Sequence, residues 1–398
     1  MLEQLQAIAP DPILGILSAF AKDPNPHKID LGVGVYRDEH GQTPMLQSVI
    51  EAERRMIAQQ TSKSYLGPAG VPGFNSAITE LVFGTDNEAL SEGRIRTVQT
   101  PGGTGALRVA ADLIKAANPA ARIWFSEPTW SNHLAIFPAA GVETGYYPYH
   151  DKQKNTLRFG EMTATLGQRR PGDAVLFHAC CHNPCGVSPN PDQWHAITDL
   201  AAERGFLPVV DIAYQGFERS IEEDNLCVRL FAQKCPEVIV TSSCSKNFAV
   251  YRERVGAISV LASHAQKAAD IETVIHSLTR KNYSMPPSHG PAVIDILLHS
   301  EELNALWRTE VTTMRERIKS MRGLLVEKIQ ASGTSRDFSF LQRQSGMFSF
   351  LGLSVDQVRR LREEFSIYTV DSARANIASF NPGNIDYFVR ALSAVVTE

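Results

Sequence analysis

The fold is decided by two stretches of the sequence, Leu207-Pro-Val-Val-Asp-Ile-Ala-Tyr214 and Val238-Ile-Val-Thr-Ser-Ser-Cys-Ser-Lys246. In each, a short apolar run leads to a residue that can carry a charge, Asp211 in the first and Lys246 in the second. Such runs are typical of strands buried on both faces of a parallel sheet. Because sheets of this kind bind ligands at the carboxyl ends of their strands, we expect Asp211 and Lys246 at one functional edge.

The same pattern extends outward on both sides. Apolar runs typical of further short strands lie at Ile123–Phe125, Val175–Phe177 and Val255–Val260, and a further strand is expected to end at Thr97–Thr100. Helical patterns lie between them, as in the spacing of Trp194, Ile197 and Ala201 after Pro191, a residue that favours the first helical turn. Strands that alternate with helices form an α/β fold with right-handed crossovers. We therefore expect a large domain over residues 45–312, with a mostly parallel sheet flanked by helices.

The C-terminal part follows a different pattern. Apolar residues recur at steps of three and four from Leu303 to Leu325, which predicts a long helix near residues 303–331 that ends before Gly333. A strand-like run at Ile367–Val370 and a closing helix around Phe388 follow. We expect residues 1–44 and 313–398 to form a smaller α+β domain, joined to the large one by the long helix.

The composition excludes several classes of protein. Of 398 residues, 43% are hydrophobic and 21% charged, which is ordinary globular usage. The net charge of −4 differs from the basic balance of nucleic-acid binders. No apolar run approaches the roughly 18 residues of a membrane span, and Met1–Pro10 lacks the basic start and apolar stretch of a secretory signal. We expect a cytoplasmic protein with neither a membrane nor a nucleic-acid partner.

Three of the six cysteines are concentrated in the segment Ala179-Cys-Cys-His-Asn-Pro-Cys185. A metal site is one interpretation, but it needs ligands that converge at tetrahedral spacing. Cys180 and Cys181 follow an apolar run, so we expect them to end a strand and to point to opposite faces. No second cysteine pair stands at zinc-ribbon spacing. The sequence favours reduced, mostly buried thiols and no metal.

A glycine-rich turn, Pro101-Gly-Gly-Thr-Gly-Ala106, precedes the helical run Leu107–Ala117. A turn of this kind presents free N–H groups and the positive end of a helix, which suits a phosphate. It lacks the G-x-G-x-x-G pattern and the Walker lysine. A plain glycine turn therefore remains an alternative.

Asp211 and Lys246 have two interpretations as well. They could form a structural ion pair, since a lysine at a buried strand end is costly unless it is paired or has a purpose. They could instead serve pyridoxal phosphate, which needs a lysine amine and a carboxylate that keeps its ring nitrogen protonated. That cofactor also needs an aromatic face and donors near its 3′-oxygen. Trp130, Asn183 and Tyr214 stand at strand ends where they could supply these.

With these residues in place, the chain resembles the class I aspartate/aromatic-amino-acid aminotransferase family, whose members are fold-type I pyridoxal-phosphate enzymes. The resemblance spans nearly the whole chain, and its order and spacing make it specific. The matching motifs are Asp11–Gly15, Leu31–Asp38, Tyr65–Gly67, Pro101–Ala106, His182–Gly186, Asp211–Phe217, Ser243–Phe248, Arg252–Gly256, Arg280–Ser284 and Arg374–Asn376.

The resemblance implies a role for each matching residue. Lys246 would bind the cofactor as a Schiff base and move the substrate proton, and Asp211, supported by His178, would pair with the ring nitrogen. Arg374 would bind the substrate α-carboxylate, and Gly34 would close over the substrate. The remaining cofactor contacts would come from Trp130 on the ring, Tyr214 and Asn183 at the 3′-oxygen, and Gly103, Thr104, Ser243, Ser245 and Arg254 at the phosphate; Trp130 and Asn183 would also reach the substrate.

The resemblance further implies a homodimer, because Tyr65, Arg280 and Ser284 enter the neighbouring subunit's site in this family. Arg280 would bind the side-chain carboxylate of a dicarboxylic substrate. Each of these residues also has a simpler interpretation: Arg280-Lys281 resembles a solvated surface pair, and Tyr65 could start a turn.

Two departures from the family pattern concern the substrate. Many aspartate-preferring members carry asparagine where this chain has Ser64 and Met285. An apolar Met285 is compatible with aromatic side chains. We expect transfer of the amino group of phenylalanine, tyrosine, tryptophan and aspartate to 2-oxoglutarate by a ping-pong mechanism. The alternatives are a strict aspartate aminotransferase, a β-lyase or decarboxylase on the same fold, and a non-catalytic regulator.

Overall fold

The computed structural model describes residues 1–7 and 12–396. Pro10 and Asp11, which belong to the predicted N-terminal features, lie outside this range. By its internal contacts the chain divides into a unit of residues 44–316 and a unit of residues 1–43 with 317–398. The boundaries predicted from the sequence lie between residues 44 and 45 and between residues 312 and 313.

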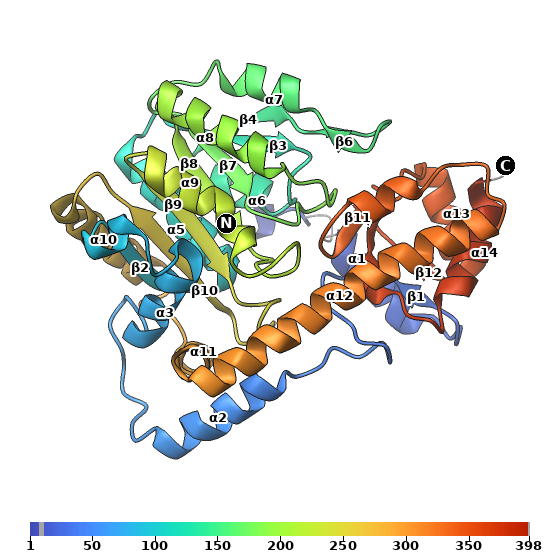
Figure 1. The fold of residues 1–398 in the computed structure, drawn as a ribbon, viewed down its shortest axis with the longest axis horizontal. Helices are drawn as coiled ribbons and strands as arrows, with labels where there is room; N and C mark the ends of the chain where they lie inside the picture. Colours follow the sequence, from blue (N-terminus) through green and yellow to red (C-terminus); the bar gives the residue numbers. More distant parts are fainter. Residues whose placement is uncertain (8–11, 397–398) are drawn as a thin grey trace. The chain divides into compact units, whose positions relative to one another are not determined.

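A seven-stranded sheet forms the centre of the unit of residues 44–316 (Figure 1). Six of its strands run in the same direction, and β10 lies antiparallel between β9 and β2. The expectation that Val255–Val260 is a parallel strand is therefore wrong, because burial on both faces does not depend on strand direction. In spatial order the strands are β2 (Ile95–Pro101), β10 (Val255–Leu261), β9 (Val238–Ser243), β8 (Leu207–Ile212), β7 (Ala174–His178), β3 (Arg122–Glu127) and β4 (Glu143–Pro148).

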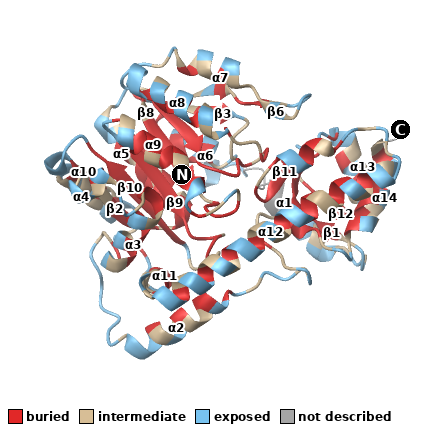
Figure 2. Cartoon of the chain, in the orientation of Figure 1, coloured by how far each residue is buried: buried red, intermediate tan, exposed pale blue. Residues whose placement is uncertain are grey.

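Helices cover this sheet, whose strands are largely buried (Figure 2). The start of α8 illustrates why they form where they do. Asn190 and Gln193 make a capping box before Pro191, and Gly205 ends the helix at a φ of 69°. The helices of this unit are α2 (Gln47–Gln59), α3 (Pro72–Phe83), α4 (Glu88–Ser91), α5 (Gly102–Ala117), α6 (His133–Ala139), α7 (Phe159–Leu166), α8 (Pro191–Arg204), α9 (Leu226–Lys234), α10 (Ala265–Asn282) and α11 (His289–His299).

The second unit contains short strands and helices. Its strands pair as β1 (Ile29–Asp30) parallel to β12 (Ile367–Tyr368), and β11 (Phe348–Phe350) antiparallel to β13 (Arg374–Asn376). The predicted strand Ile367–Val370 is thus shorter than expected. The helices are α1 (Pro12–Lys22), α13 (Val355–Phe365) and α14 (Ile385–Val396).

The long helix α12 (Glu301–Ala331) contains the boundary between the units, and Gly333 follows it at a φ of 73°. Across the described residues, every helix is too short or too polar to traverse a lipid bilayer.

The cysteine segment lies just beyond a strand rather than within it. Strand β7 ends at His178, so Cys180 and Cys181 belong to the following loop, where Cys181 has a φ of 49°. All six cysteines are buried and none forms a disulfide. Among the described residues, no group of three metal-ligating side chains converges.

Candidate active site

Three neighbouring strands bring polar side chains into register at one edge of the large sheet. His178 of β7 pairs with Asp211 of β8, which pairs with Thr241 of β9. Asp211 is buried; its Oδ1 accepts a hydrogen bond from Thr241 Oγ1 at 3.0 Å, and its Oδ2 lies 3.3 Å from His133 Nε2. Burial by itself raises the pKa of Asp211, but His133, His178 and Thr241 together bring it below its usual value. This carboxylate is therefore held ionised.

A chain of polar contacts extends behind this carboxylate. Thr129 Oγ1 lies 2.9 Å from His133 Nδ1 and 3.1 Å from His178 Nε2, so it connects the two imidazoles. Burial, and after it the nearby His133, lower the pKa of His178 to about 3, which keeps that ring neutral. The sequence assigned the support of Asp211 to His178 and missed His133. The sequence feature that could have identified His133 is its position three residues after Trp130, at the start of a helix.

Lys246 lies three residues after β9 ends and is half-buried. Its Nζ lies 4.8 Å from the centroid of the Tyr214 ring. Desolvation lowers the pKa of Lys246 to about 8; Asp211 opposes this shift and Arg254 adds to it. An amine of this pKa is partly unprotonated near neutral pH and can act as a nucleophile.

The glycine-rich turn forms a close contact between α5 and the loop after β9. A Cβ on Gly102 would lie 2.6 Å from Arg254 Nη2, and one on Gly103 would lie 3.0 Å from Ser243 Cβ. Gly102 also has a φ of +74°, which few other residues adopt. Arg254 Nη1 donates to Tyr251 O at 3.0 Å and reaches Ser245 Oγ at 3.5 Å. The first turn of α5, which includes Thr104, and this arginine are thus arranged as an anion site requires.

The sequence overlooked the role of Gly256 in this arrangement. A Cβ at this position of β10 would lie 2.5 Å from the carbonyl carbon of Gly102 and 2.7 Å from the nitrogen of Gly103. Only a glycine allows β10 to approach the start of α5 so closely. The residues therefore fit pyridoxal phosphate on two observations: a glycine cradle for a phosphate, and a lysine of lowered pKa near a buried carboxylate.

Of the three residues predicted around the cofactor ring, Trp130 and Tyr214 lie near these groups. Trp130 packs edge-on against His133, with ring centroids 5.2 Å apart and an interplanar angle of 87°. Tyr214 is buried beside Lys246. Asn183 is also buried, in the loop that follows β7.

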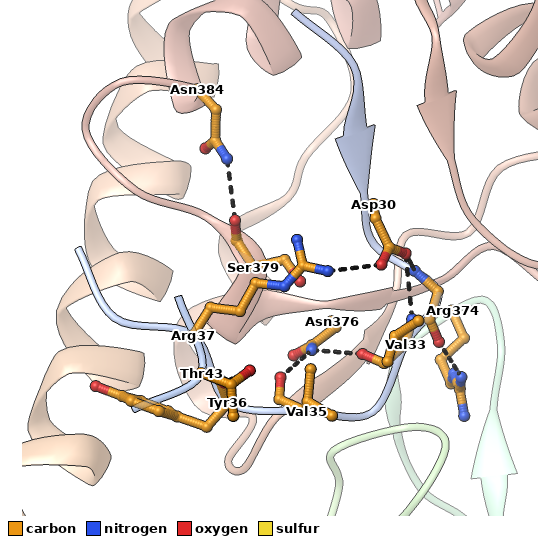
Figure 3. A network of polar contacts seen from close by, with 11 residues as sticks. Asp30, Val33, Val35, Tyr36, Arg37, Thr43, Arg374, Asn376, Ser379 and Asn384 are labelled. Carbon is orange, nitrogen blue, oxygen red and sulfur yellow. Dashed lines mark hydrogen bonds and ion pairs between the residues drawn. The ribbon is translucent and has the colours of Figure 1, made fainter. Parts of the chain in front are cut away.

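In the unit of residues 1–43 and 317–398, Arg374 of β13 belongs to a second group of polar contacts (Figure 3). It is buried, its Nη2 donates to Gly32 O at 2.7 Å, and its guanidinium lies 4.2 Å from the centroid of the Phe348 ring. Gly34 adjoins the same ring, since a Cβ there would lie 3.1 Å from Phe348 Cζ. Phe348 was not identified from the sequence.

The residues predicted to serve a neighbouring subunit lie at the surface. Tyr65 is 95% exposed, Arg280 is exposed near the end of α10, and Ser284 is exposed at a φ of 66°. Of the two positions tied to specificity, Ser64 is exposed and Met285 half-buried.

Comparison with known proteins places this geometry in context. Residues 26–392 match the family described as Aminotransferase class I and II. The chain is 46% identical to an aspartate aminotransferase from Escherichia coli, over 100% of both chains. It is also 46% identical to an aromatic-amino-acid aminotransferase from Pseudomonas aeruginosa, over 98% of this chain and 97% of the other. An aromatic-amino-acid aminotransferase from Burkholderia pseudomallei, solved covalently bound to pyridoxal phosphate, has a TM-score of 0.97 and 43% identity, covering 100% of this chain and 99% of its own.

Proposed function

The chain belongs to the class I and II aminotransferases, and on that premise we propose that it accepts both aspartate and aromatic amino acids as donors, with 2-oxoglutarate as acceptor. It is a pyridoxal-phosphate-dependent transaminase. Relatives named for aspartate and for aromatic amino acids match it at the same 46% identity, which supports the dual specificity. The observation that carries the chemistry is the buried Asp211, held by Thr241 and His133, in the same site as Lys246, whose Nζ lies 4.8 Å from the centroid of the Tyr214 ring.

When bound, pyridoxal phosphate supplies an aldehyde that bonds to amines and a ring that withdraws electrons from the adjacent carbon. Lys246 would hold the cofactor through its amine and would carry the proton to and from the substrate Cα. Asp211 keeps the proton on the ring nitrogen, and His133 and Thr241 keep Asp211 ionised and oriented.

Other residues bind and orient. Gly103, Thr104, Ser243, Ser245 and Arg254 hold the phosphate; Trp130 covers the ring, and Asn183 and Tyr214 donate to the 3′-oxygen. Arg374 binds the α-carboxylate through its planar fork, with Gly34 beside it. These assignments are supported by the family membership and, for the residues with contacts described above, by those contacts within each unit.

A homodimer completes the proposal. Tyr65, Arg280 and Ser284 reach the partner's site, and Arg280 binds the side-chain carboxylate of aspartate or 2-oxoglutarate. Large exposed apolar side chains within residues 45–66 support a buried interface there, namely Met45, Ile57, Tyr65 and Leu66. Six cysteines without a disulfide suit a reducing compartment, which supports a cytoplasmic enzyme. We also propose that residues 45–312 act as the cofactor-binding domain and that residues 1–44 with 313–398 act as the smaller one.

The test is a set of half-reactions with the purified, cofactor-loaded protein. Aspartate, phenylalanine, tyrosine and tryptophan are each mixed with it, and the change in cofactor absorbance is followed before 2-oxoglutarate is added. We expect conversion by aspartate and by all three aromatic donors. Conversion by aspartate alone would establish the strict aspartate enzyme instead. Release of product without recovery of the starting spectrum by 2-oxoglutarate would indicate a lyase or decarboxylase.

A further inference from the structure

Asp30, at the end of β1, is a carboxylate that the proposed chemistry does not use. It is 1% exposed, yet three donors satisfy it (Figure 3). Its Oδ1 accepts the backbone N–H of Gly32 at 2.9 Å and that of Val33 at 3.3 Å. Its Oδ2 accepts Arg37 Nη2 at 2.7 Å, and the Arg37 side chain is 23% exposed. A carboxylate this deeply buried is costly unless it is paired and hydrogen-bonded, so its position indicates a specific purpose.

The peptide group between Gly32 and Val33 connects Asp30 to the substrate-binding arginine. Its N–H donates to Asp30, and its carbonyl oxygen accepts Arg374 Nη2 at 2.7 Å. A hydrogen bond to a charged acceptor at one end of a peptide polarises the whole group and makes its carbonyl a stronger acceptor. Asp30 therefore strengthens and aims the contact that orients Arg374.

The same loop is held from its other side by β13. Asn376, two residues after Arg374, donates from Nδ2 to Val33 O at 2.7 Å and to Val35 O at 2.8 Å. Gly34 lies between these two anchor points and adjoins Phe348, whose ring faces the Arg374 guanidinium. The loop conformation and the guanidinium orientation are therefore fixed by one network, with Asp30 as its acidic member.

We propose that Asp30, neutralised by Arg37, is a positioning residue that aligns Arg374 for the substrate α-carboxylate through the Gly32–Val33 peptide. The inference rests on the proposed role of Arg374. A guanidinium already fixed in the binding orientation loses less conformational freedom when the substrate binds. Arg37 offsets the charge of Asp30, so Arg374 keeps its positive charge available for the substrate.

The experiment measures binding without turnover. The cofactor-loaded wild type and its Asp30→Asn, Asp30→Ala and Arg37→Met variants are titrated with 3-phenylpropionate and with succinate, and Kd is read from the cofactor absorbance. We expect Asp30→Asn to raise Kd about tenfold for both ligands, Asp30→Ala to raise it further, and Arg37→Met to raise it less. In steady state the KM for aspartate and phenylalanine should rise together, while kcat changes less than about threefold.

Two control variants separate the explanations. Asp23→Asn alters another carboxylate of the same unit, one that accepts Tyr368 Oη and the Asn25 N–H. It should leave both Kd values unchanged; if it weakens binding as much as Asp30→Asn, the effect is general loosening and the positioning role is wrong. Arg374→Ala should strongly weaken the binding of both ligands. If Arg374→Ala weakens binding while both Asp30 variants bind like the wild type, the inference is wrong and the proposed function stands. If Arg374→Ala binds both ligands normally, the role assigned to Arg374 and the inference are both wrong.

Discussion

At the scale of single residues, the amine of Lys246 is set apart by a pKa near 8. Attachment of the cofactor needs the unprotonated amine, whose share at pH 7 is about one in ten, against about one in three thousand for an ordinary lysine. We expect the rate at which the cofactor-free protein takes up pyridoxal phosphate to rise with pH and to reach half its maximum near pH 8. Stopped-flow absorbance measures this rate. A midpoint near pH 10 would contradict the desolvated environment described for Lys246.

Asp211 and its two histidines allow a second prediction at this scale. Removing the carboxylate in Asp211→Ala should cost about 2.7–4 kcal/mol of transition-state stabilisation, comparable to other single electrostatic groups. His133→Leu should lower kcat/KM about tenfold and exceed the effect of His178→Leu, because His133 contacts the carboxylate directly and His178 acts through Thr129. Single-turnover kinetics with aspartate would compare the three variants. A larger loss of kcat/KM in His178→Leu than in His133→Leu would contradict the direct support of Asp211 by His133.

Lys246 and Asp211 could be singled out from the sequence because each follows an apolar strand run. For His133 the sequence offers only its position three residues after Trp130, because it belongs to a short helix whose position relative to β8 depends on the folded chain. Asp30 is similar: its partners are backbone groups two and three residues away and a side chain seven residues away, and no pattern of residue types indicates this.

At the scale of elements, β10 and the start of α5 make a contact that only glycine permits. Gly256→Ala would place a methyl group 2.5 Å from the Gly102 carbonyl carbon and should destabilise the cofactor-free protein by about 1–3 kcal/mol, as overpacking does. Gly323 is the matched control, because in α12 no atom lies within 4 Å of its Cβ position. Gly323→Ala should stabilise the cofactor-free protein by about 0.5–1 kcal/mol. Thermal unfolding should show opposite shifts in Tm; equal shifts would mean that β10 can move away from α5.

The long elements of the large sheet were predictable because several consecutive apolar residues define each strand. The direction of β10 was not, since burial on both faces is the same in parallel and antiparallel strands. Strands β1, β11 and β13 contain only two or three residues each, too few for any periodicity to appear. The strand that carries Arg374 was therefore visible only through a motif.

At the scale of the whole molecule, the proposed dimer makes specificity a shared property of two chains. Arg280→Ala should reduce the half-reaction with aspartate by about two orders of magnitude or more, because a lost charge-assisted pair costs about 1.5–3 kcal/mol and leaves the substrate carboxylate unpaired. The half-reaction with phenylalanine should change little. Measuring each half-reaction separately avoids interference from 2-oxoglutarate, which also has two carboxylates. Equal losses for both donors would make Arg280 a structural residue.

The family and cofactor predicted from the motifs are confirmed by the family match and by the relatives. The parts of the site contributed by Tyr65, Arg280 and Ser284 stay predictions, since their proposed partners belong to a second copy. In the proposed dimer the choice between aspartate and aromatic donors would depend on such exposed residues, and no sequence pattern ranks exposed residues by their effect on donor choice.

The six buried cysteines can serve as chemical probes of local unfolding. Burial raises the pKa of Cys185 to about 12 and that of Cys235 to about 11, and it raises the pKa values of Cys227 and Cys244 as well. Because only the thiolate reacts quickly with alkylating reagents, the folded chain is protected both sterically and electronically. Alkylation of a buried cysteine therefore requires local unfolding around it. Peptide mapping of the modified sites identifies the regions of the fold that unfold locally.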